Sequence, residues 1–203
     1  ARRDTQAIVL APTHELAMQI FREAQLLADN SGLPVTAAVI IGDVNIARQI
    51  DRLKDRPHLL VGSSGRILEL IQKRKINAQT VKTIVLDEAD RLLDDNHRVS
   101  VAAIIKATQK DRQLLAFSAT IPATALEKAV GMSNDAVVVT IAAPTAVPPE
   151  IEHLYFVVET RDKIEFLRKL LASLQVDRAL VFINTSAAIE ETVAKLCHHG
   201  VAA

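Results

Sequence analysis

The sequence predicts an α/β protein in which a parallel sheet carries helices on both faces. Short apolar runs alternate along the chain with longer amphipathic stretches, as they do in βαβ units. The runs are apolar at consecutive residues rather than at every second one, which is typical of parallel strands buried on both faces. An apolar content of 49% and a charged content of 24% are ordinary for a globular protein.

The elements of the first part of the chain follow from this alternation. We expect strands at residues 6–10, 35–41, 58–61, 83–86, 114–117 and 137–141. We expect helices at residues 14–30, 46–53, 67–75, 99–108 and 123–130. Thr13 and Asn45 stand directly before the first two helices, where their side chains can cap free backbone N–H groups. Gly32 follows the first helix as a stop signal, and a basic turn ends the third.

A proline-rich stretch then divides the chain. Residues 142–150 contain three prolines, which make a stiff and extended connector. We therefore place a first domain at residues 1–141, a linker at 142–150 and a second domain at 151–203. In the second domain we expect strands at 151–158 and 179–183 and helices at 163–174 and 187–198. Two strands and two helices are too few to close an independent core, so we expect this domain to be truncated.

The charge balance and the cysteine content limit the functional classes. The chain carries 24 basic and 24 acidic residues, so no overall basic field points to a nucleic-acid partner. Backbone N–H groups at helix starts can still hold phosphates. The single cysteine, Cys197, excludes an intramolecular disulfide and indicates a reducing, cytoplasmic location. No apolar stretch is long enough to span a bilayer, and we expect a monomer without membrane attachment.

Two adjacent acids mark the most informative point of the sequence. Asp87 and Glu88 follow directly on the apolar run at 84–86. Ligands of open α/β sheets bind at the carboxyl ends of strands, and two carboxylates there repel each other unless a cation or water lies between them. Mg²⁺ carrying nucleotide phosphates suits the pair, with one acid serving the metal and the other orienting the attacking water. The alternative is that both acids offset the macrodipole of the following helix.

Three other expected strands also lead into a small polar turn and a helix start. These turns lie at residues 11–17, 62–66 and 118–120. Each exposes backbone N–H groups at the carboxyl edge of a sheet, a geometry suited to phosphate oxygens. Because Ser and Thr caps after strands are common, no single turn identifies a ligand site.

Taken in order, these segments resemble the DEAD-box RNA helicase family. The matching segments are Pro-Thr-His-Glu-Leu-Ala at 12–17, Ser-Ser-Gly-Arg at 63–66, Val-Leu-Asp-Glu-Ala-Asp at 85–90, Ser-Ala-Thr at 118–120 and Val-Phe-Ile-Asn-Thr at 181–185. The resemblance implies RecA-like parallel sheets of the P-loop NTPase type, with ATP and Mg²⁺ as cofactors. It implies RNA as the partner, held by its sugar-phosphate backbone without sequence readout.

The resemblance also assigns roles to individual residues. Asp87 would hold Mg²⁺ through water, and Glu88 would lie at the metal and polarise the water that attacks the γ-phosphate. Asp90 would couple to Ser118 and Thr120, which links nucleotide state to strand separation. The residues expected to contact RNA are Pro12, Thr13, His14, Gly42, Gly65, Arg66, Asn184 and Thr185.

The chain departs from the family pattern at three places. His14 stands where the family usually has Arg, which removes a permanent positive charge. Asp43 replaces a glycine after Gly42 and adds a negative side chain near the expected RNA path. Ser63 and Ser64 replace Thr-Pro, which loosens the turn. Together these departures predict weakened RNA affinity.

The sequence also lacks a glycine-rich phosphate loop with its Lys and Ser/Thr. We therefore expect a fragment of an ATP-dependent RNA helicase that is inactive alone. One alternative is a non-catalytic RNA-binding or scaffold module derived from a helicase, which the intact acids and Ser118 disfavour. Another is a P-loop ATPase acting on something other than RNA, which the Pro-Thr-His-Glu-Leu-Ala segment and the Ala-Asp ending of the acidic tetrad disfavour.

Overall fold

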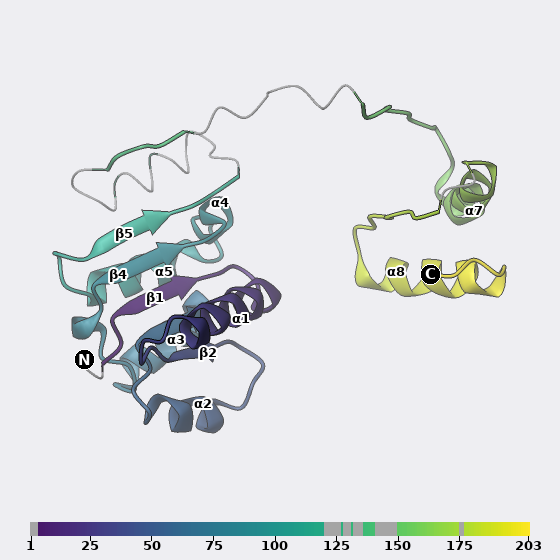
Figure 1. Ribbon diagram of the computed structural model, residues 1–203. Coiled ribbons are helices and arrows are strands. Elements are labelled where there is room, and N and C mark those ends of the chain that lie inside the picture. Colours follow the sequence, from purple (N-terminus) through teal and green to yellow (C-terminus); the bar gives the residue numbers. More distant parts are fainter. Residues whose placement is uncertain (1–3, 120–126, 128–130, 132–135, 141–149, 175–176) are drawn as a thin grey trace. The chain divides into compact units, whose positions relative to one another are not determined.

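Figure 1 shows the computed structural model of the protein. The structure describes residues 4–119, 127, 131, 136–140, 150–174 and 177–203. The chain divides into two compact units, Ala1–Val139 and Thr140–Ala203. Most of the proline-rich stretch, at 142–149, lies outside the described residues, as does the helix expected at 123–130 apart from Glu127.

The first unit is built on a five-stranded parallel sheet with the strand order β2-β3-β1-β4-β5. The strands are β1 (Ala7–Leu10), β2 (Ala37–Ile40), β3 (Leu59–Gly62), β4 (Thr83–Leu86) and β5 (Gln113–Ala116). Strand β1 lies at the centre, with β2 and β3 on one side of it and β4 and β5 on the other. The chain therefore fills one half of the sheet before it starts the other.

The last residues of all five strands are in register. Leu10 of β1 pairs with Gly62 of β3 and with Leu86 of β4. Gly62 in turn pairs with Ile40 of β2, and Leu86 pairs with Ala116 of β5. The strands thus end level with one another at one side of the sheet, the carboxyl edge, toward which the arrowheads of Figure 1 point.

Helices connect the strands. They are α1 (His14–Asn30), α2 (Ile46–Leu53), α3 (Ser64–Gln72), α4 (Ala89–Leu92) and α5 (Arg98–Ala107), with a 3₁₀ turn η1 (Ala78–Thr80). The side chains of Thr13 and Asn45 accept hydrogen bonds from the backbone N–H groups of Leu16 (3.2 Å) and Ala47 (2.8 Å). The two helix caps expected from the sequence are therefore confirmed. In the part of the chain that the structure describes, no helix is long and apolar enough to cross a membrane.

Apolar side chains bury both faces of the sheet. Leu60 of β3 belongs to the larger core cluster, together with Ile67 of α3 and Ile104 of α5. Val61, the next residue of the same strand, packs instead with Ala17 of α1. Because successive strand residues point to opposite faces, α1 covers one face and α3 and α5 cover the other (Figure 1). The expected α/β fold, a parallel sheet with helices on both faces, is confirmed.

Two details of the first unit differ from expectation. Helix α3 begins at Ser64 rather than at residue 67. Ser64 is 1% exposed, and its hydroxyl accepts a hydrogen bond of 2.7 Å from Ser100 Oγ on α5. This tertiary contact explains why residues expected in a polar turn belong to the first turn of α3. Residues 137–140 form no strand.

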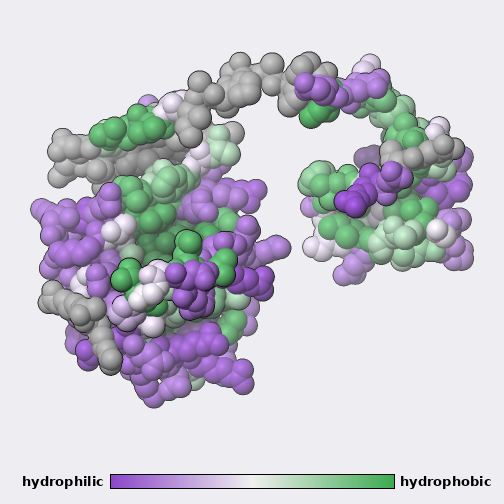
Figure 2. All heavy atoms as spheres, in the orientation of Figure 1, coloured by the Kyte–Doolittle hydropathy of each residue, from purple (hydrophilic) through white to green (hydrophobic). Residues whose placement is uncertain are grey.

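The second unit contains the 3₁₀ turn η2 (Thr160–Asp162) and the helices α7 (Lys163–Leu174) and α8 (Ser186–His198). Its two expected strands, at 151–158 and 179–183, are not strands, so those predictions are wrong. A strand persists only against hydrogen-bonded neighbours, and the described residues of this unit provide none. Tyr155 and Phe182 are consequently 90% and 87% exposed, and Figure 2 shows hydrophobic surface on this unit.

The substitution Gly62→Ala is expected to destabilise the first unit. A Cβ atom at this position would lie 1.8 Å from the carbonyl oxygen of Ile40, so β2 and β3 would have to separate at the carboxyl edge. We expect the free energy of unfolding, measured by urea denaturation, to fall by about 3 kcal/mol or more. The control is Gly65→Ala, because a Cβ atom there meets nothing within 4 Å. Its effect should stay within about 1 kcal/mol, and equal losses in the two variants would contradict the close approach.

Candidate functional site

The expected site residues of the first unit that the structure describes all follow the carboxyl ends of strands. In sheet order, Gly42 follows β2, Gly65 and Arg66 follow β3, Pro12, Thr13 and His14 follow β1, Asp87, Glu88 and Asp90 follow β4, and Ser118 follows β5. The residues expected to contact RNA therefore lie beyond β2, β3 and β1, and the expected catalytic residues lie beyond β4 and β5. The level strand ends bring both groups to one edge, where open α/β sheets bind ligands.

Asp87 and Glu88 stand where β4 ends. The backbone N–H of Asp87 donates to the carbonyl oxygen of Leu10 (3.0 Å), which extends the pairing with β1 by one residue. Oδ1 of Asp87 accepts a hydrogen bond from the N–H of Glu88 (3.1 Å). Glu88 itself has φ 49° and ψ 56°, a left-handed conformation that costs roughly 1–2 kcal/mol for a residue with a Cβ atom. Backbone strain of this kind gathers at functional sites.

The carboxylate of Glu88 has one oxygen without a hydrogen bond. This oxygen, Oε2, is shielded from solvent and lies 3.2 Å from Nη1 of Arg91, an ion pair that lacks hydrogen-bond geometry. The Glu88 side chain makes no capping bond to α4, which argues against the interpretation of this acid as a plain helix cap. A shielded acceptor that makes no hydrogen bond is unfavourable, and a bound water or cation would satisfy it.

A short hydrogen bond joins Asp90 to Ser118. The hydroxyl of Ser118 donates to Oδ1 of Asp90 at 2.7 Å, a charge-assisted bond between the segments that follow β4 and β5. Next to it, the N–H of Ala89 donates to the carbonyl oxygen of Phe117 (2.9 Å). The two segments are therefore tied together by side chain and by backbone. Thr120, the third expected member of this group, lies outside the described residues.

Pro12, Thr13 and His14 turn the chain from β1 into α1. The Thr13 hydroxyl caps the helix through the N–H of Leu16, so this side chain is held in place by its own helix. The first N–H groups of an α-helix have no acceptor within the helix. The start of α1 thus presents N–H groups at the carboxyl edge, a geometry that binds phosphate oxygens.

His14 also contacts the loop that follows β2. Its Nε2 accepts a hydrogen bond from the N–H of Gly42 (3.1 Å), so this ring nitrogen carries no proton. Nδ1 lies 3.7 Å from Oδ2 of Asp43, whose side chain is 95% exposed. A Cβ atom on Gly42 would lie 3.0 Å from Nε2 of His14, so glycine lets the ring approach the loop. His14, which replaces a charged Arg of the family pattern, and Asp43, which adds a negative charge, therefore face each other.

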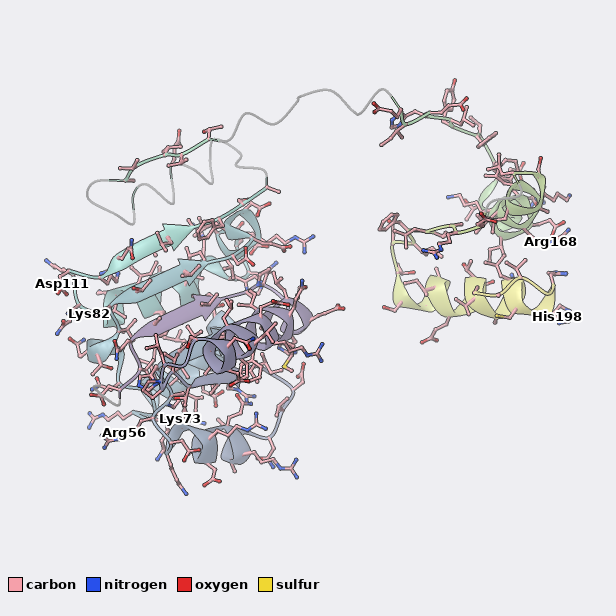
Figure 3. The ribbon with its side chains drawn as sticks, viewed as in Figure 1. Arg56, Lys73, Lys82, Asp111, Arg168 and His198 are labelled. Atoms are coloured by element: carbon pink, nitrogen blue, oxygen red, sulfur yellow. The ribbon has the colours of Figure 1, made fainter. Side chains whose placement is uncertain are left out.

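Arg66 is held by the protein itself. Its Nη1 donates to the carbonyl oxygen of Val44 (3.0 Å), and its Nε lies 3.0 Å from Oε2 of Glu69. Lys73, labelled in Figure 3, donates a hydrogen bond to Glu69 (2.7 Å) and holds the pKa of that carboxyl below its ordinary value, while Arg66 adds smaller effects in the same direction. Gly65, beside Arg66, leaves open space where a side chain would be.

Asn184 and Thr185 belong to the second unit and lie directly before α8. The hydroxyl of Thr185 accepts a hydrogen bond from the N–H of Ala188 (3.4 Å) and caps the helix. Both residues line a groove that Lys163 of α7 also lines. In this unit too, the expected RNA-contacting residues thus stand at a helix start.

The acid pair fits Mg²⁺ better than it fits a metal held by protein alone. Among the described residues no group of three or more His, Cys, Asp or Glu side chains lies close enough to hold a metal ion. Mg²⁺ is commonly bound by one or two carboxylates, with water and nucleotide phosphates completing its coordination. Asp87 and Glu88 supply such carboxylates, and Oε2 of Glu88 is an acceptor without a hydrogen bond.

The sequence patterns did not single out Gln49, whose buried side chain holds the loop after β2 in place. Its amide is 2% exposed and binds the backbone of the loop after β2, at Ile41 and Val44. A signal was present in the sequence, because residue 49 lies on the apolar face of α2 with Ile46 and Ile50. A polar residue at a position where helical periodicity calls for an apolar one indicates a buried hydrogen-bonding role.

Two solved structures show the same fold. Dbp5 of Saccharomyces cerevisiae, bound to RNA and ADP BeF3, aligns with a TM-score of 0.81 and 26% identity over 98% of this chain and 50% of that one. A DEAD box protein from Methanococcus jannaschii aligns with a TM-score of 0.62 and 32% identity over 97% of this chain and 52% of that one. The first unit is thus a RecA-like α/β domain.

Sequence comparison shows the family. Residues 1–129 match the model of the DEAD/DEAH box helicases. The chain is 38% identical over 201 residues to the probable ATP-dependent RNA helicase YfmL of Bacillus subtilis, covering 98% of this chain and 52% of YfmL. It is 37% identical over 194 residues to the helicase CshC of Bacillus cereus, covering 96% of this chain and 49% of CshC. The chain belongs to the DEAD/DEAH box helicase family, and it spans about half the length of these curated relatives.

The hydrogen bond between Ser118 and Asp90 should contribute measurably to stability. We expect Ser118→Ala to lower the free energy of unfolding by about 1 kcal/mol, because it leaves a partly buried carboxylate without this donor. A double-mutant cycle in urea tests the pair. The double variant Ser118→Ala/Asp90→Ala should lose less than the sum of the two single variants. Strictly additive losses would mean that the two side chains do not interact in solution.

Proposed function

We propose that this chain is part of an ATP-dependent RNA helicase, in which RNA-stimulated ATP hydrolysis separates short RNA duplexes. One observation carries the proposal: a single edge of the sheet holds an acid pair beyond β4 and, beyond β1 and β3, helix starts whose N–H groups suit phosphate oxygens. The half at β4 and β5 suits nucleotide hydrolysis, and the half at β2, β3 and β1 suits an RNA backbone. Family membership supports the same assignment.

The acids after β4 would carry the hydrolytic chemistry. Mg²⁺, held by Asp87 through water and flanked by Glu88, would neutralise phosphate charge when ATP is bound. Glu88 would orient the water that attacks the γ-phosphate, using the acceptor Oε2 that has no hydrogen bond in the protein. The left-handed backbone of Glu88 supports this role, because it sets the carboxylate at the turn between β4 and α4.

Asp90 and Ser118 would pass the state of the nucleotide to the neighbouring strand. The acids and Asp90 lie within one tetrapeptide, so any movement of Glu88 on hydrolysis is transmitted to Asp90 within a few bonds. The 2.7 Å hydrogen bond then connects Asp90 to the segment beyond β5. The proposal gives Thr120 a place in the same coupling.

The other half of the edge would hold RNA by its sugar-phosphate backbone. In the first unit the proposed contacts are Pro12, Thr13, His14, Gly42, Gly65 and Arg66; in the second they are Asn184 and Thr185. Helix-start N–H groups bind phosphate without a large positive field, which suits a chain with no net charge. Dbp5, which shares this fold, is described as bound to RNA and ADP BeF3.

A second candidate is a non-catalytic RNA-binding module derived from a helicase. The departures from the family pattern at His14 and Asp43 favour it. The chain as given also carries no phosphate loop, and we expect the 203-residue chain alone not to hydrolyse ATP. Its cytoplasmic location and monomeric state stay predictions.

The substitution Glu88→Gln in the full-length protein tests the proposal. We expect RNA-stimulated ATP turnover to fall by at least about 100-fold, because the amide orients and deprotonates water poorly. RNA affinity, measured by fluorescence anisotropy, should stay within about twofold of the unmodified protein. Glu23→Gln, the same chemical change on an exposed position of α1, is the control and should leave turnover intact.

Two results would speak against the helicase. RNA binding without any RNA-stimulated turnover by the unmodified full-length protein would favour the binding module. Turnover that survives Glu88→Gln would remove the acid pair from the mechanism.

A further inference from the structure

Gln49 lies buried beneath the loop that joins β2 to α2. Its side chain is one of few polar groups in the described core, and it is 2% exposed. Burial of an amide is unfavourable unless its donors and acceptor are all used. Since Ile46, Ile50 and Leu53 of the same helix pack on the apolar core, an apolar side chain would suit residue 49 better if packing were its only task.

The amide of Gln49 is used completely by the loop. Its Oε1 accepts a hydrogen bond from the N–H of Ile41 (3.1 Å), and its Nε2 donates to the carbonyl oxygens of Ile41 (2.9 Å) and Val44 (3.3 Å). These partners fix the orientation of the amide, because an N–H only donates and a carbonyl only accepts. The loop itself contains Asp43 at φ 51°, a conformation that needs support from outside.

The outer side of the same loop holds two of the proposed RNA-contacting side chains. The N–H of Gly42 donates to Nε2 of His14 (3.1 Å), and the carbonyl of Val44 accepts from Nη1 of Arg66 (3.0 Å). Val44 thus receives one bond from Gln49 and one from Arg66 at the same carbonyl oxygen. The segments after β1, β2 and β3 therefore meet on one short loop.

We infer that Gln49 is a positioning residue for RNA binding: it fixes the loop of residues 41–45 and, through the Val44 carbonyl, the guanidinium of Arg66. The inference rests on the proposed function, since it concerns the same RNA-binding edge. Gln49 is buried and touches no ligand itself. Without this amide, the backbone groups of Ile41 and Val44 lose these hydrogen bonds and the loop is no longer held in one conformation. Arg66 then keeps only its ion pair with Glu69.

The test is a binding titration of the 203-residue chain with a fluorescein-labelled oligouridylate of about 12 nucleotides at low salt, followed by anisotropy. The variant Gln49→Met keeps the length of the side chain and removes its hydrogen bonds. We expect it to weaken RNA binding by about tenfold, the scale of one lost positioning contact. The control, Thr108→Val, also removes a buried polar group, the hydroxyl at the end of α5, which is remote from the carboxyl edge, and should leave affinity within about twofold.

A readout beyond stability comes from the double variant Gln49→Met/Arg66→Ala. If Gln49 acts through Arg66, the effect of Gln49→Met should shrink to less than about threefold once Arg66 is gone. Full multiplication of the two effects would overturn the inference. So would an unchanged affinity of Gln49→Met, with RNA binding by the unmodified chain intact. Absence of any saturable binding by the unmodified chain would instead overturn the proposed RNA-binding function, and the inference with it.

A second variant covers the case in which Gln49→Met does not fold. Gln49→Glu has nearly the same shape, and a protonated carboxyl group can both donate and accept, whereas the ionised form can only accept. We expect its affinity, relative to the unmodified chain at the same pH, to recover as the pH is lowered, because burial favours the protonated acid. A ratio that does not change with pH would contradict the role of the Gln49 donor.

Discussion

The level ending of five parallel strands is the constraint on which the rest of the structure depends. Leu10, Gly62 and Leu86 lie side by side in the ladder, so each following turn opens at the same edge. Backbone N–H and C=O groups beyond that edge have no strand partner, so they form hydrogen bonds with neighbouring loops or with ligands. Gly62 keeps β2 and β3 close enough for this arrangement, because the carbonyl of Ile40 leaves no room for a side chain.

Charged side chains at the two edges of the sheet have different partners. At the edge where the strands begin, Lys82 and Asp111 form an ion pair of 2.9 Å (Figure 3), and Lys82 holds the pKa of Asp111 below its ordinary value. At the carboxyl edge, Glu88 keeps a shielded oxygen without a hydrogen bond. The N–H groups at the start of α1, rather than a global field, would supply the proposed binding of phosphates.

Sequence patterns predicted most of the first unit, and they failed where distant contacts decide. The strand at 83–86 and the helices at 14–30 and 46–53 follow from local periodicity and caps. The rule that parallel strands end at one edge predicts that the segments after these strands lie at the same edge, as they do. The start of α3 at Ser64 depends on a hydrogen bond with Ser100, 36 residues further along the chain, which no local pattern shows. The left-handed turn at Glu88 follows from no periodicity either. The apolar runs of the second unit lack the partners that make a strand.

The most direct test of the shared edge is a nuclear magnetic resonance titration of the ¹⁵N-labelled 203-residue chain with single-stranded RNA. We predict that the amide signals of Thr13, Gly42 and Gly65 shift together as RNA is added, while those of Lys82 and Asp111 at the opposite edge stay in place. Shifts confined to the opposite edge, or spread evenly over the unit, would contradict the assignment of the carboxyl edge as the RNA-binding surface.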